Sequence, residues 1–145
     1  LAIMKTSKIK DGEGWIFNPF TGFHISSDQG FCKPLNQFKD KLHGLVSRSE
    51  WEKGLFSEVK DNAILSPRGS IAFKLGLLAS GASDFVVSVK PKSIWDIAAG
   101  TILCEERGIA FFENGVEVKA LDKKRYTPPL LWCRKDNFDE LNPLF

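Results

Sequence analysis

The sequence predicts an α/β protein, and three observations support this class. The composition of its 145 residues is that of a globular domain, with 43% apolar and 26% charged residues, which excludes a disordered or collagen-like chain. The first third consists of short strand-like runs separated by turns. From about His43 onward, apolar strand-like runs alternate with segments of helical periodicity.

The first third predicts an antiparallel meander. Residues 11–14 (Asp-Gly-Glu-Gly) are typical of a hairpin turn that leads into a strand at 14–17. A second turn at 18–22 precedes a strand at 23–26, whose side chains alternate between two faces. The segment contains no helix that would bury one face, so we expect it to belong to a larger sheet.

The next segment alternates between strands and helices. We expect strands at 44–47 and 63–65. Ser49 and Glu52 match a capping box that opens a helix ending near residue 60. A second helix is predicted at 69–80, where Gly81 closes it.

The last third predicts the remaining elements. The run 85–89 has no polar face, which is typical of a central strand. An apolar stripe predicts a helix at 94–107, ended by Gly108. We further expect strands at 109–112, 116–118 and 126–133 and a short helix at 136–141.

Charge and cysteine content exclude several classes of function. Twenty Lys and Arg against 18 Asp and Glu leave a net charge of +2, which argues against a nucleic acid polymer as partner. No apolar run approaches the roughly 18 residues of a membrane helix, so no membrane partner is expected. Three distant cysteines without a CxxC pair argue against a disulfide framework or zinc site and favour a reducing, cytoplasmic location.

Ready-made catalytic motifs are absent from the sequence. There is no GxSxG, no P-loop and no HExxH, and the only histidines are His24 and His43. A glycine pair at 12–14 begins a GxGxxG pattern, but it lies in the predicted hairpin turn. The sequence therefore does not support catalysis by a nucleophilic serine, by a P-loop or by a histidine-bound zinc ion.

The start of the helix predicted at 69–80 is a candidate anion site. Free amides and the helix dipole favour an anion beside Gly69 and Ser70. Lys74 lies four residues after Ser70, on the same face, where its ammonium group can reach a bound phosphate. The alternative interpretation is a capped surface helix with a solvated lysine.

Asp96 is a candidate ligand for a hard cation. It lies in the first turn of the helix predicted at 94–107, between Trp95, which we expect to be buried, and the small residues 98–100. Close packing of that turn would hold the carboxylate rigidly at the mouth of a sheet. The alternative is an aspartate that only compensates the helix dipole.

Residues 95–105 (WDIAAGTILCE) resemble the second signature of the inositol monophosphatase superfamily, which is WDxAAG followed by an apolar stretch and EAGG. Gly69-Ser70, the segment 78–81 and Asp84 match the helix and strand that precede this signature. Residues 14–22 (GWIFNPFTG) resemble the family's GVxYNPxTG strand and turn. The resemblance covers nearly the whole chain.

The resemblance implies a layered α-β-α-β-α sugar-phosphatase-type sandwich, of which this chain is the C-terminal part with an incomplete N-terminal sheet. Residues 1–42 would be remnant antiparallel strands of an N-terminal α+β domain, and 43–145 a C-terminal α/β domain. The implied activity is that of a magnesium-dependent, lithium-sensitive phosphatase acting on a small phosphorylated metabolite. Asp96 matches a magnesium ligand, and Gly69 and Ser70 match the loop beside the substrate.

Three details favour a 3'(2'),5'-bisphosphate nucleotide as substrate. Ser47 begins a segment that resembles the SRSH of the bisphosphate nucleotidases, although Glu50 replaces the histidine. Lys74 matches a lysine of those nucleotidases near the substrate. Asp96 follows Gly81 by 15 residues, as in the nucleotidases. Inositol-type members place a glutamate where Ser88 stands, and an inositol monophosphatase-type activity is the alternative.

Two departures from the family pattern limit what this chain can do. Residues 105–108 (Glu-Glu-Arg-Gly) replace EAGG, and the first signature, DPxDGT with an upstream Glu-Glu pair, is absent. The resemblance therefore places no catalytic residue within this chain, and one recognised carboxylate should bind Mg²⁺ weakly. We expect the chain alone to be inert and to need the missing N-terminal segment in cis or in trans, with a homodimer as a further expectation. The competing class is a non-catalytic module.

Overall fold

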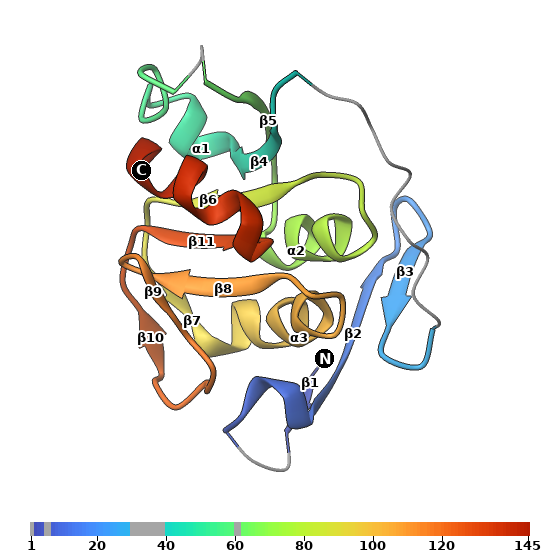
Figure 1. Ribbon diagram of the computed structural model, residues 1–145. Coiled ribbons are helices and arrows are strands. Elements are labelled where there is room, and N and C mark those ends of the chain that lie inside the picture. Colours follow the sequence, from blue (N-terminus) through green and yellow to red (C-terminus); the bar gives the residue numbers. More distant parts are fainter. Residues whose placement is uncertain (1, 5–6, 30–39, 60–61) are drawn as a thin grey trace.

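The computed structural model describes residues 2–4, 7–29, 40–59 and 62–145 and has a layered arrangement (Figure 1). A three-stranded antiparallel sheet and a six-stranded mixed sheet enclose two helices between them. Short helices cover the other face of the larger sheet. The α/β class and the layered sandwich predicted from the sequence are confirmed.

The small sheet is the predicted meander, in the order β1-β2-β3. Its strands are β1 (Ala2–Met4), β2 (Gly12–Asn18) and β3 (Phe23–Ser26). The turn predicted at 11–14 is wrong, because the 3-10 helix η1 (Ile9–Asp11) precedes β2, which already begins at Gly12. The buried Ile9 fixes this earlier turn, since its amide donates to the Lys119 carbonyl oxygen at 3.1 Å.

The large sheet has the order β5-β4-β6-β11-β8-β9. Its strands are β4 (His43–Ser47), β5 (Ile64–Arg68), β6 (Phe85–Ser88), β8 (Ala110–Glu113), β9 (Val116–Glu117) and β11 (Leu130–Cys133). β4 runs parallel to β5 and β6, whereas β11 runs antiparallel to β6 and β8. All four residues of β6 are buried, which confirms it as a central strand.

The strand predicted at 126–133 is divided in two. β10 (Arg125–Tyr126) pairs with β7 (Lys92–Ser93) outside the large sheet, and the chain enters that sheet only at β11. Pro128 and Pro129 separate the two strands because neither has an amide hydrogen to donate to a ladder.

Two helices lie between the sheets, α2 (Ile71–Ala79) and α3 (Ile94–Glu105), close to their predicted bounds. A Cβ on Gly100 would lie 2.4 Å from the Leu75 Cβ, and one on Gly14 would lie 2.6 Å from the Ala99 carbonyl oxygen. The absence of these two side chains lets α3 pack directly on α2 and β2. The core formed there is the larger of two apolar clusters.

The other face of the large sheet carries short helices. They are α1 (Arg48–Trp51), η2 (Lys135–Asn137), α4 (Phe138–Leu141) and η3 (Asn142–Leu144). The helix predicted from Ser49 to about residue 60 is wrong. α1 ends at Trp51, and turns follow through Gly54, which has a left-handed φ of 71°. These turns bury Phe56 and Val59 in the second core, a contact that a continued helix would not make.

Cys104 and Cys133 are both free and buried, and Cys32 lies outside the described residues. Within the ranges that the structure describes, no helix has the length and apolar character needed to cross a bilayer.

Candidate functional site

The candidate site lies where three parallel strands end. Ser47 at the end of β4 pairs in register with Arg68 at the end of β5, and Ser88 ends β6 on the other side of β4. The three segments that leave these ends are α1, the turn into α2 and residues 89–92. Ligands of α/β sheets bind outside the carboxyl ends of such strands, so this edge is where a site is expected.

A fully buried carboxylate organises this edge. Glu50, in α1, has no exposed surface. Its Oε2 accepts a hydrogen bond from the Val89 amide at 3.2 Å, and its Oε1 lies 3.2 Å from the Ser88 hydroxyl oxygen. Lys92 Nζ approaches Oε1 to 3.6 Å. Glu50 therefore ties the end of β6 and the chain after it to α1.

Lys74 is a buried cation beside this carboxylate. It is only 2% exposed, and its Nζ donates to the Arg68 carbonyl oxygen at 3.4 Å. Burial lowers the pKa of Lys74 to about 8, while the charge of Glu50 opposes this shift and that of Lys92 adds to it. At neutral pH the ammonium form predominates, so the edge holds a poorly solvated positive charge.

The turn between β5 and α2 places the other predicted substrate-binding residues. Ser70 is the N-cap of α2: its Oγ accepts from the Phe73 amide at 3.3 Å, and its φ is 55°. A positive φ at a residue other than glycine is unusual and is often found at binding sites. The Arg48 guanidinium lies against Gly69, 2.7 Å from where a Cβ would be. The Ser47 hydroxyl is 3.0 Å from that of Ser49.

The predicted metal ligand, Asp96, belongs to α3. It is exposed in the first turn of α3, and among the described residues no hydrogen bond or ion pair joins it to Ser47, Gly69, Ser70 or Lys74. The prediction that Trp95 is buried is wrong, since it is 75% exposed. Residues 97–104 of α3 are buried, and Ile94 in the first turn packs against the same core, so Trp95 and Asp96 are the exposed residues of that turn.

The implied magnesium ion is not matched by the residues present. In the described ranges, no three His, Cys, Asp or Glu side chains gather closely enough to hold a metal. Asp96 supplies one exposed carboxylate, whereas Mg²⁺ requires near-octahedral oxygen coordination from carboxylates, phosphates and water. These residues therefore do not form a magnesium site by themselves.

The sequence does not predict Glu50 or Lys92 as site residues. In the sequence, Glu50 only replaces a histidine of the segment that Ser47 begins, and no local pattern marks it as buried. A usable signal was present for Lys92, because the basic run 90–92 (Lys-Pro-Lys) directly follows an apolar central strand. Such a run places cations at the end of that strand.

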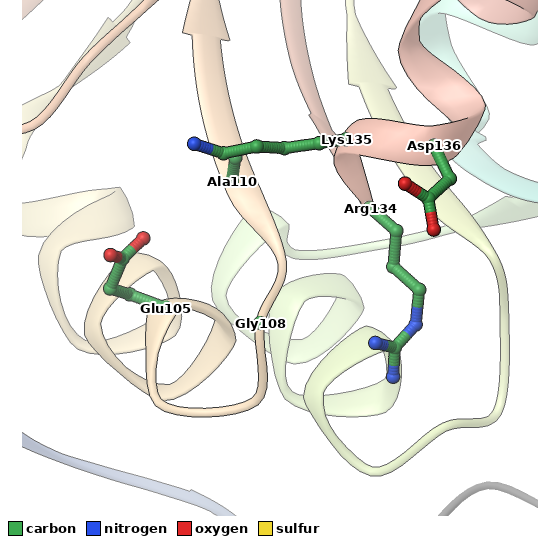
Figure 2. Close-up of a pocket in the computed structure, with 6 residues that line it drawn as sticks. All are labelled: Glu105, Gly108, Ala110, Arg134, Lys135 and Asp136. Atoms are coloured by element: carbon green, nitrogen blue, oxygen red, sulfur yellow. The ribbon is translucent and has the colours of Figure 1, made fainter.

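A pocket also lies at the opposite end of the sheet (Figure 2). Cys133 pairs with Phe85 and Ala110 at the starts of β6 and β8, so Arg134 lies at their amino ends. The pocket is lined by Glu105, Gly108, Ala110, Arg134, Lys135 and Asp136. None of the residues predicted as site residues lines it.

Comparison with solved structures finds the same fold. One match is a hypothetical protein from Pyrococcus horikoshii with similarities for inositol-1 monophosphatase (TM-score 0.70, 18% identity, 94% of this chain and 58% of that one). A second is the inositol monophosphatase of Anabaena (Nostoc) (TM-score 0.68, 19% identity, 91% and 57%). A third is CysQ from Bacteroides thetaiotaomicron, a bacterial member of the inositol monophosphatase family (TM-score 0.54, 23% identity, 70% and 40%).

These likenesses establish the fold at low sequence identity. No protein-family model matches the sequence, and the comparison with curated proteins gave no match. The chain spans a little over half the length of the first two structures. Its fold therefore corresponds to a little over half of each of those two chains.

Proposed function

We propose that the chain is the C-terminal portion of a magnesium-dependent phosphomonoesterase whose substrate is a 3'(2'),5'-bisphosphate nucleotide. The observation that carries the proposal is the buried ammonium group of Lys74 at the carboxyl edge of the sheet. The likeness of the fold to inositol monophosphatase-family structures supports the reaction class.

The charges at this edge favour a phosphate over a sugar hydroxyl. A phosphate dianion is well matched to a lysine ammonium that has lost most of its water. Sugar hydroxyls are usually bound by carboxylates, but Ser88 ends β6, and the nearby Glu50 carboxylate is buried and already engaged by Val89 and Lys92. An inositol monophosphatase-type activity is the alternative within the same fold.

We further propose that Asp96 is one ligand of the magnesium ion and that the remaining ligands come from an N-terminal segment, in cis or in trans. The chain alone is then inert. The small sheet supports a partner segment, because Phe17 and Phe20 are 65% and 97% exposed. The division at residue 42, a homodimer and a cytoplasmic location stay predictions.

A non-catalytic module is the second candidate. It is favoured by the lack of a three-ligand metal cluster in the described ranges. Arg107 also supports it, since the residue that replaces a family glycine is buried and donates to the Leu103 carbonyl oxygen at 3.0 Å and to that of Ser26 at 3.4 Å. It thereby holds α3 to β3 and has a structural role.

The test begins with the intact mass and N-terminal sequence of the protein as made in its source. That protein is then assayed with a bisphosphate nucleotide and an inositol phosphate, with and without Mg²⁺. We expect magnesium-dependent release of phosphate, with the nucleotide preferred. Asp96→Ala should abolish it, whereas Asp139→Ala, an exposed aspartate in α4, should not. Full activity of Asp96→Ala would remove Asp96 from the site, and turnover by the 145-residue chain alone would contradict its proposed inertness.

A further inference from the structure

A second group of cations lines a cavity at the opposite end of the large sheet from Lys74. The cavity has a volume of about 520 Å³, which is within the usual range for small-molecule sites. Lysines outnumber glutamates by two in its lining, which includes Lys8, Lys10, Lys119, Lys135, Glu105 and Glu117. We propose that this cavity binds a small molecule that carries a diphosphate group.

The wall that carries Lys8 and Lys10 is fixed by its backbone. Lys8 forms an isolated antiparallel bridge with Ala120, and the Ile9 amide donates to the Lys119 carbonyl oxygen at 3.1 Å. The Ile9 side chain is 1% exposed and packs in the larger core. The buried isoleucine between the two lysines therefore holds them at the cavity, next to the segment that carries Lys119.

Glu117 holds the other two lysines at the cavity. Its carboxylate oxygens lie 2.8 Å from Lys135 Nζ and 4.0 Å from Lys119 Nζ. The two lysines come from different segments, since Lys119 follows β9 and Lys135 begins η2. Their side chains are 78% and 63% exposed, so water screens both ion pairs. A bound anion can therefore replace Glu117 as their partner at little cost.

The kind and number of cations indicate the class of ligand. All four are lysines, whose ammonium group is a compact point charge with three donors, whereas a planar carboxylate is best matched by the fork of an arginine. Two linked phosphate groups offer acceptors to several lysines at once, and their negative charge offsets the excess of lysines over glutamates. The diphosphate has two sources, free pyrophosphate or the diphosphate of a nucleotide.

This cavity is separate from the proposed phosphatase site. Glu105 ends α3 and Asp96 lies in its first turn, so roughly 13 Å of helix separates the two residues. Lys135 lies two residues after Cys133, which pairs with the first residue of β6, whereas Ser88 ends that strand. Binding in the cavity requires neither Mg²⁺ nor turnover, so it stands or falls separately from the proposed activity.

Isothermal titration of the chain with pyrophosphate, at pH 7 and without Mg²⁺, tests the cavity. We expect Lys10→Met and Lys119→Met each to weaken binding by about fivefold. Lys53→Met removes the same charge from an exposed side chain in the turns after α1, at the other end of the sheet, and it should bind like the wild type. Wild-type affinity in both cavity variants, or an equal loss in Lys53→Met, would overturn the proposal.

NMR of the wild-type chain gives a readout that needs no variant. Pyrophosphate should shift the backbone amide signals of residues 8–10 and 119–121. Shifts confined to residues 69–74 would place pyrophosphate at the proposed phosphatase site and overturn the cavity.

A comparison of ligands then distinguishes the two sources of the diphosphate. ADP that binds more than about tenfold tighter than pyrophosphate indicates a nucleotide, because the rest of the molecule then also contacts the cavity. A smaller difference indicates free pyrophosphate. Succinate, a dicarboxylate with the same number of anionic groups, should bind much more weakly. Succinate binding as tight as that of pyrophosphate would overturn the phosphate class.

Discussion

The two ends of the large sheet each carry a glutamate–lysine pair, and the pairs differ in burial. At the carboxyl end, Glu50 and Lys92 are 3.6 Å apart, with side chains 1% and 17% exposed. On the side of the opposite pocket, Glu117 and Lys135 are closer, at 2.8 Å, but 27% and 63% exposed. Water screens the second pair far more than the first.

Burial, not distance, therefore distinguishes the two ends of the sheet. A carboxylate without access to water must be held by donors, and Glu50 has the Val89 amide, the Ser88 hydroxyl and Lys92. Glu117 and Lys135 are in contact with water and do not need such a set of donors. A solvated pair of this kind is typical of an ordinary protein surface.

The largest effect that follows from this comparison is on stability. Glu50→Ala leaves Lys92 without its partner and the Val89 amide without its acceptor, so we expect the free energy of unfolding to fall by about 3 kcal/mol. Glu50→Gln keeps an acceptor for the amide and should lose less. Urea unfolding followed by circular dichroism measures both.

Glu117→Ala is the matched control for that experiment, because it also removes a carboxylate paired with a lysine. Its unfolding midpoint should stay close to that of the wild type. If Glu50→Ala costs no more than Glu117→Ala, then Glu50 is solvated in solution and the contrast between the two ends fails.

The second prediction concerns pH, and the two ends should respond with opposite signs. Lys74 has a pKa of about 8 when folded and 10.5 when unfolded, so between these values the unfolded chain binds more protons. The cost of burying the charged lysine is fully present below pH 8 and is removed as pH rises. As the pH rises, the free energy of unfolding of the wild type should therefore increase, relative to that of Lys74→Met, by at most about 3 kcal/mol.

Lys135 provides the opposite case. Its hydrogen bond to Glu117 raises its pKa above 10.5, so the stability that it adds is present below that value and is lost as pH rises through the folded pKa. Urea unfolding between pH 7 and pH 10 should therefore separate Lys74→Met from the wild type but leave Lys135→Met parallel to it. Parallel curves for Lys74→Met would show that its ammonium group is not buried.

Much of the fold could be predicted because its signals are local. The run that became β6 is apolar at every position, as a strand covered on both faces must be. Gly81 and Gly108 have left-handed φ values of 84° and 73°, which explains why they end the two predicted helices. The helix predicted after Ser49 failed because Phe56 and Val59 gain more by packing in the second core than by continuing α1.

The site could be predicted only in part, because some of its contacts join residues that are far apart in the sequence. Lys74 and Ser70 lie on one helix, so their proximity follows from helical spacing. Glu50 meets Ser88 across 38 residues of sequence, and only the tertiary fold brings them together. The exposure of Trp95 also depends on the tertiary fold, because Ile94 and Ile97 on either side of it pack in the core while Trp95 faces solvent.

The smallest effect is the dependence of the two pairs on salt. In double-mutant cycles, the coupling between Glu117 and Lys135 should fall toward zero in about 0.5 M NaCl, because the Debye length is then only a few ångströms and the pair is exposed. The coupling between Glu50 and Lys92 should persist, since little solvent reaches the carboxylate. Each cycle combines both single variants with the double variant, so the free-energy cost of leaving one partner unpaired cancels to first order. If salt weakens both couplings equally, ions reach Glu50 as readily as Glu117, and burial no longer distinguishes the two ends of the sheet.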